Sequence, residues 1–294
     1  MIFRNEKYLK SKIRTVTIIS KEKYMHEYYE KNLNKWNKTL TAYMNLICSE
    51  LNSLTGQSYD VLVQEIWTDY QTHMLERFPY IGGDAASGTK NLTVAYMFVS
   101  MGEILKKYGV TTEQSGHLMI LIYERQFKKI PSFLRRLMGK IFTNPGFLTK
   151  MFLKKDRQNA LNAAQNPGSF ETKTQIPPEK GYDFSYHNLV CPLADFAKKY
   201  GYEEYMPYLC NLDYVMFGIL GAPLYREHTC FEDGDYCDFK LKLSAKPMDY
   251  DPPVFTQGNK TLRFTKLHIF RSASAAFIIN SSIVLSCGIY VFMT

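Results

Sequence analysis

The chain has 294 residues, of which 46% are hydrophobic and 15% aromatic. This composition supports a sizeable core and excludes a disordered protein. The net charge of +8 is concentrated between Arg125 and Arg157, where ten Lys or Arg residues accompany one acidic residue, Asp156. The rest of the chain is close to neutral, which excludes a globally basic nucleic-acid binder, and no helix-turn-helix, zinc-finger or RNA-binding aromatic motif is present. The basic segment either lies on anionic lipid or packs its apolar side on the protein.

Two features bear on the cellular compartment. Six cysteines are too few for a disulfide scaffold, and the charged opening residues MIFRNEKYLKSKIR contain no secretory signal, so we expect a cytoplasmic, bacterial-type protein with free thiols. Residues 272–294 carry no charge and follow Lys266, His268 and Arg271. They are long enough for a C-terminal membrane anchor, although Asn280 and five serines leave a buried strand pair or an atypical terminus open.

Apolar residues recur at helical spacing through the first part of the chain. Thr111 and Gln114 have the spacing of a capping box. We expect helices over residues 21–54, 58–78, 91–108 and 112–128, with two more starting near Pro131 and Pro145.

The character of the sequence changes near residue 168, where a Pro/Gly-rich stretch begins. Beyond it we expect a strand ending at Val190, helices over about 192–200 and 203–220, and strands over about 223–230 and 236–243. The sequence therefore predicts an α+β protein with three regions: a mostly helical region 1–168, an α+β module 169–250 with helices packed on an antiparallel sheet, and a tail 251–294.

A glycine-rich loop, GGDAASGTKN, precedes one of the expected helices. Gly83 and Gly88 have the spacing of a phosphate loop, but Thr89 precedes Lys90 and a helix precedes the loop, so the pattern argues against nucleotide binding. Two interpretations of Asn91 remain. It either caps the helix or marks a helix N-terminus that could hold a carboxylate.

Cys210 and Asp213 are the clearest chemical pair in the sequence. Their i, i+3 spacing places the thiol and the carboxylate on one helix face, together with Tyr214 and Phe217. A thiol can act as a nucleophile, and a carboxylate can activate water. A buried cysteine is more often a small hydrophobic residue, but a buried aspartate needs a partner.

The segment CFEDGDYCDF, residues 230–239, predicts a hairpin with an acidic turn. Strand alternation places Cys237 and Phe239 on the face that packs on the helices and Asp238 on the other face. On the partner strand, Arg226, His228 and Cys230 share a face, which is more typical of a site than of a core.

The cysteines of this region do not have the spacing of a structural zinc site. Cys191, Cys210, Cys230 and Cys237 are separated by 18, 19 and 6 residues, whereas zinc ligands usually come in pairs two to four residues apart. A catalytic zinc held by His228 together with cysteines is the alternative that this spacing leaves open. We expect no metal and no cofactor, and a disulfide between Cys230 and Cys237 is not expected in a reducing compartment.

Several motifs resemble the family of L-2-amino-thiazoline-4-carboxylic acid hydrolases. They are NLVCPLADFAKKYG around Cys191, PYLCNLDYVMF with Cys210 and Asp213, and GDYCDF at 234–239. RFPYIGGDAASGTKNLTVAYMFVSMGEILKKYGVTTEQ is similar to the family's N-terminal half, so the resemblance covers about residues 58–243. It implies ring-opening hydrolysis of a thiazoline carboxylate to a carbamoyl-cysteine. GDxCxF endings also occur in vinyl-reductase-type modules, so a non-catalytic module that binds or senses a small molecule is the alternative.

The chemistry that this family implies needs a base or a nucleophile, an acid, and a group that holds the carboxylate. We expect Cys210, or water activated by Asp213, to attack, with His228 as acid or base and Cys237 as a further catalytic candidate. Arg226 and Asn91 are candidates for binding the carboxylate. Cys191, Tyr214 and Asp238 complete the candidate substrate-binding residues.

Overall fold

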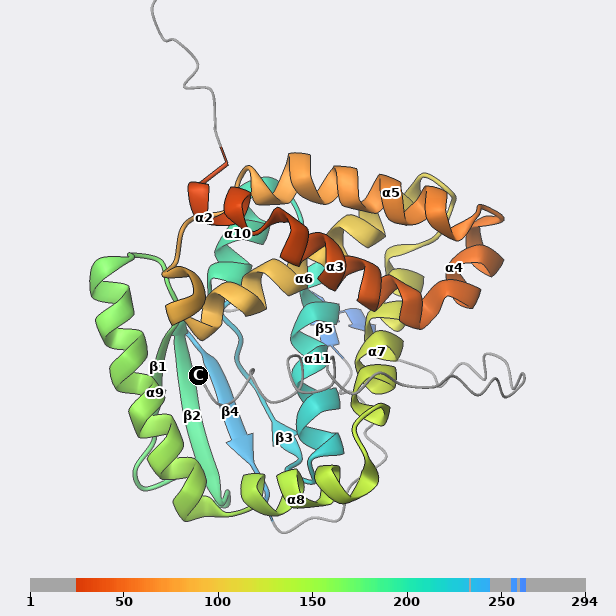
Figure 1. The fold of residues 1–294 in the computed structure, drawn as a ribbon. Helices are drawn as coiled ribbons and strands as arrows, with labels where there is room; N and C mark the ends of the chain where they lie inside the picture. The colour runs from red at the N-terminus through yellow and green to blue at the C-terminus, as the bar shows by residue number, and fades with distance from the viewer. Residues whose placement is uncertain (1–24, 233, 244–254, 258–259, 263–294) are drawn as a thin grey trace, which may run out of the picture.

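A computed structural model describes residues 25–232, 234–243, 255–257 and 260–262. Helices from the first part of the chain form a layer above the sheet (Figure 1). The first group comprises α2 (Glu27–Lys31), α3 (Leu33–Met44), α4 (Cys48–Thr55), α5 (Tyr59–Asp69) and α6 (Ser87–Lys106). The chain continues through α7 (Thr112–Lys128), α8 (Ser132–Phe142), α9 (Pro145–Gln165), α10 (Pro192–Tyr200) and α11 (Met206–Ile219). Later helices lie around the sheet, with α9 and α11 on its two sides and α8 below it (Figure 1).

Local backbone geometry divides the first expected helix. Asn32 lies between α2 and α3 with φ −105° and ψ 10°, and its side-chain amide donates to the Tyr28 carbonyl. A short 3₁₀ turn, η2 (Asn45–Ile47), separates α3 from α4. The second expected helix begins at Tyr59 and passes into a π-helical segment, η3 (Tyr70–Leu75). The apolar pattern correctly indicated helix here, but not the breaks.

The helix expected from residue 91 begins earlier, at Ser87. The glycine loop already ends in a 3₁₀ turn, η4 (Gly83–Ala85), and the extended residue Ala86 precedes the first helical turn. Asn91 therefore lies inside α6 and does not cap it. By contrast, α7 begins as expected, because Thr111 Oγ1 accepts the Gln114 N–H at 3.2 Å and Gln114 Oε1 accepts the Thr111 N–H at 2.9 Å.

The main sheet has four antiparallel strands in the order β1-β2-β4-β3. Its strands are β1 (Glu171–Thr174), β2 (Phe184–Val190), β3 (Leu224–Tyr225) and β4 (Cys237–Leu241). Tyr186 pairs with Phe239, and the two rings stack at 4.5 Å. The expected α+β fold is confirmed.

The expected hairpin is less regular than its sequence indicates. β3 contains only two residues, and an irregular segment replaces the strand expected to continue to residue 230. The reason is local: the carboxylate of Asp238, rather than a strand backbone, accepts the N–H groups of Glu227 and His228.

A short turn, η5 (Glu203–Tyr205), extends α11 at its start, in agreement with the helix expected over 203–220.

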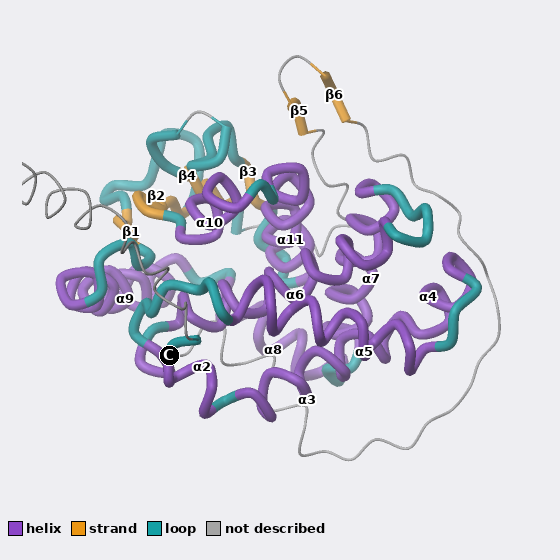
Figure 2. The backbone as a smooth tube through the Cα atoms, turned by 90° about the horizontal axis from the view of Figure 1, so that it is seen from above, coloured by secondary structure: helices purple, strands orange, loops and turns teal. Residues whose placement is uncertain are grey.

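The helical region and the module after residue 168 share one core. Phe152 on α9 lies against the rings of Phe184 and Tyr186 on β2, at centroid distances of 5.0 and 4.5 Å. Figure 2, seen from above, places α9 beside β1 and α11 beside α7. The space between α6, α9, α11 and the sheet is consequently lined from both sides of residue 168.

Beyond β4 the structure describes two short antiparallel strands, β5 (Phe255–Gln257) and β6 (Lys260–Leu262). The apolar segment 272–294 lies outside the described residues. Within the described ranges, no helix combines the length and the apolar character that crossing a bilayer requires.

Candidate functional site

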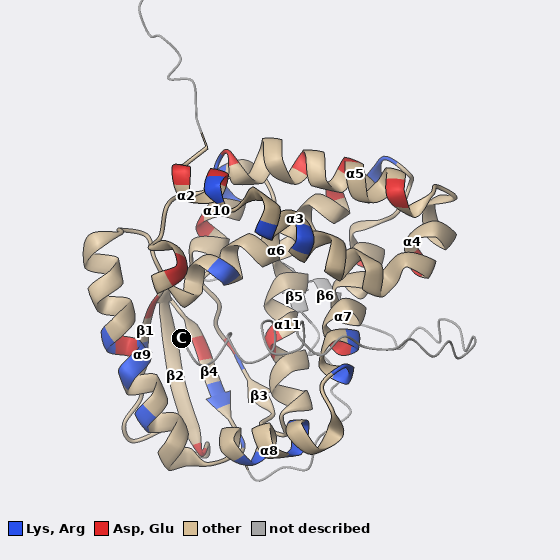
Figure 3. Ribbon diagram, in the orientation of Figure 1, with Lys and Arg blue, Asp and Glu red and all other residues tan. Residues whose placement is uncertain are grey.

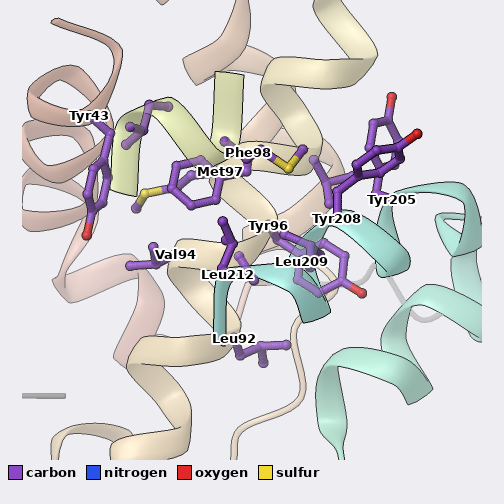
Figure 4. Close-up of a cluster of buried hydrophobic side chains, with 14 of the residues drawn as sticks. Tyr43, Leu92, Val94, Tyr96, Met97, Phe98, Tyr205, Tyr208, Leu209 and Leu212 are labelled. Carbon is purple, nitrogen blue, oxygen red and sulfur yellow. The ribbon is translucent and has the colours of Figure 1, made fainter. Parts of the chain in front are cut away.

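A cavity of about 160 Å³ lies between α6, α9, α11 and the inward face of the sheet. An apolar cavity of roughly 150 Å³ is enough to hold benzene, so this one has room for a small ring. Part of its wall is apolar and belongs to the cluster in Figure 4, where Tyr43, Val94, Leu209 and Leu212 are labelled. The remaining wall carries charges and thiols, as expected of a site that orients a polar ligand.

The charged centre of this wall is an ion pair between Asp213 and Arg226. Arg226 Nη1 donates to Asp213 Oδ2 at 2.9 Å, and Nη2 donates to the Cys210 carbonyl at 2.6 Å. The guanidinium lies 5.1 Å from the Tyr214 ring centroid and 5.0 Å from that of Phe239. Only 2% of the Arg226 side chain is exposed, so the pair fixes both residues.

Asp213 retains access to the cavity despite this pairing. Its side chain is 37% exposed, and because Asp213 is a lining residue, we attribute this open surface to the cavity. Burial raises the pKa of the carboxyl above its ordinary value, and the positive charge of Arg226 opposes this only in part. Asp213 is therefore a stronger base than an aspartate in water, with Oδ1 left outside its hydrogen bond to Arg226.

Three thiols line the same cavity, and they differ in acidity. Burial raises the pKa of Cys210 well above its usual range and that of Cys191 to about 12, so both are neutral thiols. The neighbouring Cys230 lowers the pKa of Cys237 against the effect of burial, and the charge of Arg226 adds to this. The Cys230 N–H also donates to Cys237 Sγ at 3.2 Å. Cys237, rather than Cys210, has the environment of a reactive thiol.

Lys155 is a cavity residue that the sequence did not single out. The other basic residues of α9, which are Lys150, Lys154 and Arg157, are exposed, and Figure 3 shows Lys and Arg along the outside of this helix. Lys155 instead lines the cavity, with Nζ 5.3 Å from the Phe152 ring centroid. The sequence does contain a pattern that could have identified Lys155. Phe152, Lys155 and Asn159 follow an i, i+3, i+7 spacing within a basic helix, and all three line the cavity.

The structure brings six of the nine candidate residues together and leaves three outside the cavity lining. The lining includes Asn91, Cys191, Cys210, Asp213, Arg226 and Cys237. Tyr214 lies beneath the Arg226 guanidinium and supports it. His228 is exposed on the irregular segment, with its ring centroid 5.5 Å from that of Tyr236, so it does not join Cys210 and Asp213.

Asp238 lies on the opposite face of the sheet, as strand alternation predicted. Its carboxylate is 2% exposed, pairs with Lys240 Nζ at 2.7 Å and accepts backbone N–H groups from the segment that follows Arg226. A substrate-binding role for Asp238 is therefore not supported by its position. Among the side chains that the structure describes, no group of three or more His, Cys, Asp or Glu residues is placed to hold a metal ion.

The protein has an α+β fold, and its cavity carries charged side chains and thiols. Residues 122–241 match the model of the L-2-amino-thiazoline-4-carboxylic acid hydrolase family, which confirms the resemblance over this part of the chain. Residues 58–121, where we also expected similarity, lie outside the match. Neither the curated proteins nor the solved structures contain a match to this chain. The matched residues include Lys155, Cys191, Cys210, Asp213, Arg226 and Cys237.

Proposed function

We propose that this protein is a hydrolase that opens the ring of a 2-amino-thiazoline-4-carboxylate to give a carbamoyl-cysteine. The observation that carries the proposal is the Asp213–Arg226 pair on the wall of a ring-sized cavity, within the residues that match the hydrolase family. A carboxylate with a raised pKa and a free oxygen can take a proton from water inside an enclosed site.

The reaction needs water to add to the ring carbon that lies between sulfur and nitrogen. Asp213 accepts a proton from this water while the oxygen bonds to carbon, and it passes that proton to the ring nitrogen of the former C=N bond. Asp213 then takes the hydroxyl proton of the tetrahedral intermediate as the C=O bond forms and either the C–S or the ring C–N bond breaks, and it delivers this second proton to the leaving atom. One water is consumed in either case. Breaking C–S releases a thiol, and breaking C–N releases an amine.

The acidities of the thiols favour this water route over attack by Cys210. A neutral thiol is a poor nucleophile, and Arg226 contacts the carbonyl of Cys210 rather than its sulfur. Cys237 is the alternative nucleophile because its pKa is lowered and its side chain lines the cavity. His228, expected to be the acid or base, has no place in this scheme because it lies outside the cavity lining.

Three variants separate these routes. Asp213→Asn should lower turnover of the thiazoline carboxylate by on the order of 100-fold or more, the usual contribution of a general base. Cys210→Ala should retain activity to within about tenfold, because a neutral buried cysteine acts mainly through packing. Product formation is followed by mass spectrometry, and separate thiol and amine assays identify the bond that breaks.

Cys237→Ser tests the covalent alternative. Retained turnover in this variant is expected for the water route, whereas loss of turnover together with a substrate adduct on the wild-type protein would assign the attack to Cys237. Full activity in Asp213→Asn would contradict the proposed base. Saturable binding of the thiazoline without any product would identify the protein as a small-molecule-binding module instead.

A further inference from the structure

Lys155 is a cation on the cavity wall. Among the residues that the structure describes, its Nζ makes no hydrogen bond and no ion pair within 4.0 Å, and it lies 5.3 Å from the centroid of the Phe152 ring. We infer that Lys155 is the binding group for the carboxylate of the substrate, an inference that rests on the proposed hydrolase function. Nothing in the family match assigns this role to a residue.

The two carboxylates whose charges act on Lys155, Asp156 and Asp213, both make hydrogen bonds to other groups. Asp156, its neighbour on α9, accepts hydrogen bonds from Thr172 Oγ1 at 2.7 Å and from the Thr174 N–H at 2.8 Å. Asp213 is paired with Arg226. A cation withdrawn from water is costly unless an anion compensates it, so the cavity is prepared for a negatively charged ligand.

The other expected carboxylate-binding group is less suitable. Arg226 already uses Nη1 and Nη2 for Asp213 and the Cys210 carbonyl, and only 2% of its side chain is exposed. Arg226 is thereby a positioning residue for Asp213. Lys155 differs because its ammonium group is uncommitted and lines the same cavity as Asp213.

Lys155 and Asp213 line the same cavity, and we place one small ligand between them. They come from α9 and α11, and the negative charge of Asp213 acts on the pKa of Lys155, which burial lowers below its ordinary value. A thiazoline carboxylate bound to Lys155 would present its ring toward Asp213. In this arrangement the anion is required for orientation as well as for affinity.

A pair of saturated analogues tests this inference without turnover. Thiazolidine-4-carboxylate and thiazolidine share the ring but differ in the carboxylate, and neither contains the C=N bond that is hydrolysed. Calorimetric affinities are measured for the wild-type protein, Lys155→Gln, Lys155→Arg and the control Lys154→Gln, whose lysine is the exposed neighbour on α9.

Lys155→Gln should weaken binding of the carboxylate analogue by about tenfold or more, as expected on removing a partly buried charge partner, and leave thiazolidine binding within about twofold. Lys155→Arg should retain most of the affinity, and Lys154→Gln all of it. Circular dichroism checks that each variant is folded. Equal affinities in Lys155→Gln and Lys154→Gln would overturn the inference, as would a wild-type protein that binds both analogues equally or binds neither.

The pH dependence of binding supplies a second readout. The carboxylate preference of the wild type requires protonated Lys155, so it should disappear as pH rises through a pKa below the usual lysine value. In Lys155→Arg it should persist, because arginine stays charged. Asp156 on α9 and Asp213 on α11 act on the charge of Lys155. The other charged and titratable groups of the cavity lining are Lys90 on α6, Arg226 after β3, the thiols Cys191, Cys210 and Cys237, and the tyrosines Tyr43 on α3, Tyr123 on α7 and Tyr186 on β2. A preference that persists equally in both proteins would contradict the assignment.

The outcomes for Lys155 and for the proposed hydrolysis can be told apart. Lys155-dependent binding of the carboxylate analogue, with no turnover of the thiazoline, would keep the anion site and reject the hydrolase. Turnover that depends on Asp213, together with analogue binding that is insensitive to Lys155, would keep the hydrolase and reject the anion site at Lys155. Where turnover occurs, Lys155→Gln should raise KM for the carboxylate substrate more than it lowers kcat.

Discussion

At the scale of single residues, Asp238 connects the back of the sheet to the site. Its carboxylate accepts the N–H groups of Glu227 and His228 and pairs with Lys240, whose side chain is 5% exposed. These contacts hold the segment that begins with Arg226, so a residue outside the cavity fixes a residue inside it.

Replacing Asp238 with Asn should destabilise the protein by about 2–3 kcal/mol. Breaking a buried ion pair usually costs roughly 3–5 kcal/mol, and here Lys240 keeps a second partner in Glu227 at 3.1 Å. Urea unfolding at pH 7 measures the change. Glu227→Gln is the control, because Glu227 is 71% exposed and should contribute well under that amount.

The same residue predicts how stability depends on pH. Burial alone would raise the pKa of Asp238, but Lys240 and the backbone N–H groups lower it below the ordinary aspartate value. The Asp238 carboxylate therefore adds to the free energy of unfolding at pH values above its unfolded-state pKa of about 3.9. This stabilisation is lost as the pH falls through the lower pKa of Asp238 in the folded protein. An acid unfolding profile of Asp238→Asn that keeps the full wild-type slope in this window would contradict this.

At the scale of elements, close packing between α7 and α11 holds the helix that carries Asp213. A Cβ atom added at Gly116 on α7 would overlap the ring of Tyr208 on α11, and one at Gly102 on α6 would overlap the ring of Tyr205. Two glycines thus provide space for tyrosines near the start of α11. Side-chain volume, rather than hydrogen bonding, sets how closely α7 and α11 approach each other.

Gly116→Ala should destabilise the protein by about 1–3 kcal/mol, because overpacking exceeds the gain of up to about 1 kcal/mol in helix propensity. It should also weaken ligand binding, since α11 would shift with Tyr208. Gly146→Ala on α9 is the matched control, because its nearest neighbour, Asn144 Oδ1, would lie at 3.5 Å, an ordinary contact. Thermal unfolding compares the two, and equal melting temperatures would contradict the packing argument.

At the scale of the whole molecule, the hydrophobic core continues from Tyr29 to Leu243. Residues from both sides of residue 168 line the cavity. The described part should therefore unfold as one cooperative unit, despite the change in sequence character near residue 168.

Two local probes test this cooperativity. Trp36 and Trp67 report on the helical region by fluorescence, and the buried thiols Cys230 and Cys237 report on the sheet by their reaction with a thiol reagent. Coincident denaturant midpoints are expected. Two separated transitions would indicate independent domains with a boundary near residue 168.

Several features of the fold could be predicted because they depend on neighbours in sequence. The capping box at Thr111, the limits of α10 and the extent of α11 follow from residues within one or two helical turns. The breaks within residues 25–55 and the early start of α6 were missed, because they depend on the conformations of single residues such as Asn32 and Ala86. The pair Cys210 and Asp213 could be found because helical spacing alone places them on one face.

By itself, the sequence determined the α+β class, the family resemblance, and the inward face of β4 with Cys237, because these follow from periodicity and short motifs. Only the tertiary structure decided which charges meet. It paired Arg226 with Asp213, placed His228 outside the cavity lining and turned Lys155 away from the basic surface. The physical reason is that the energies of buried charges depend on partners distant in sequence, and no local pattern records where those partners lie.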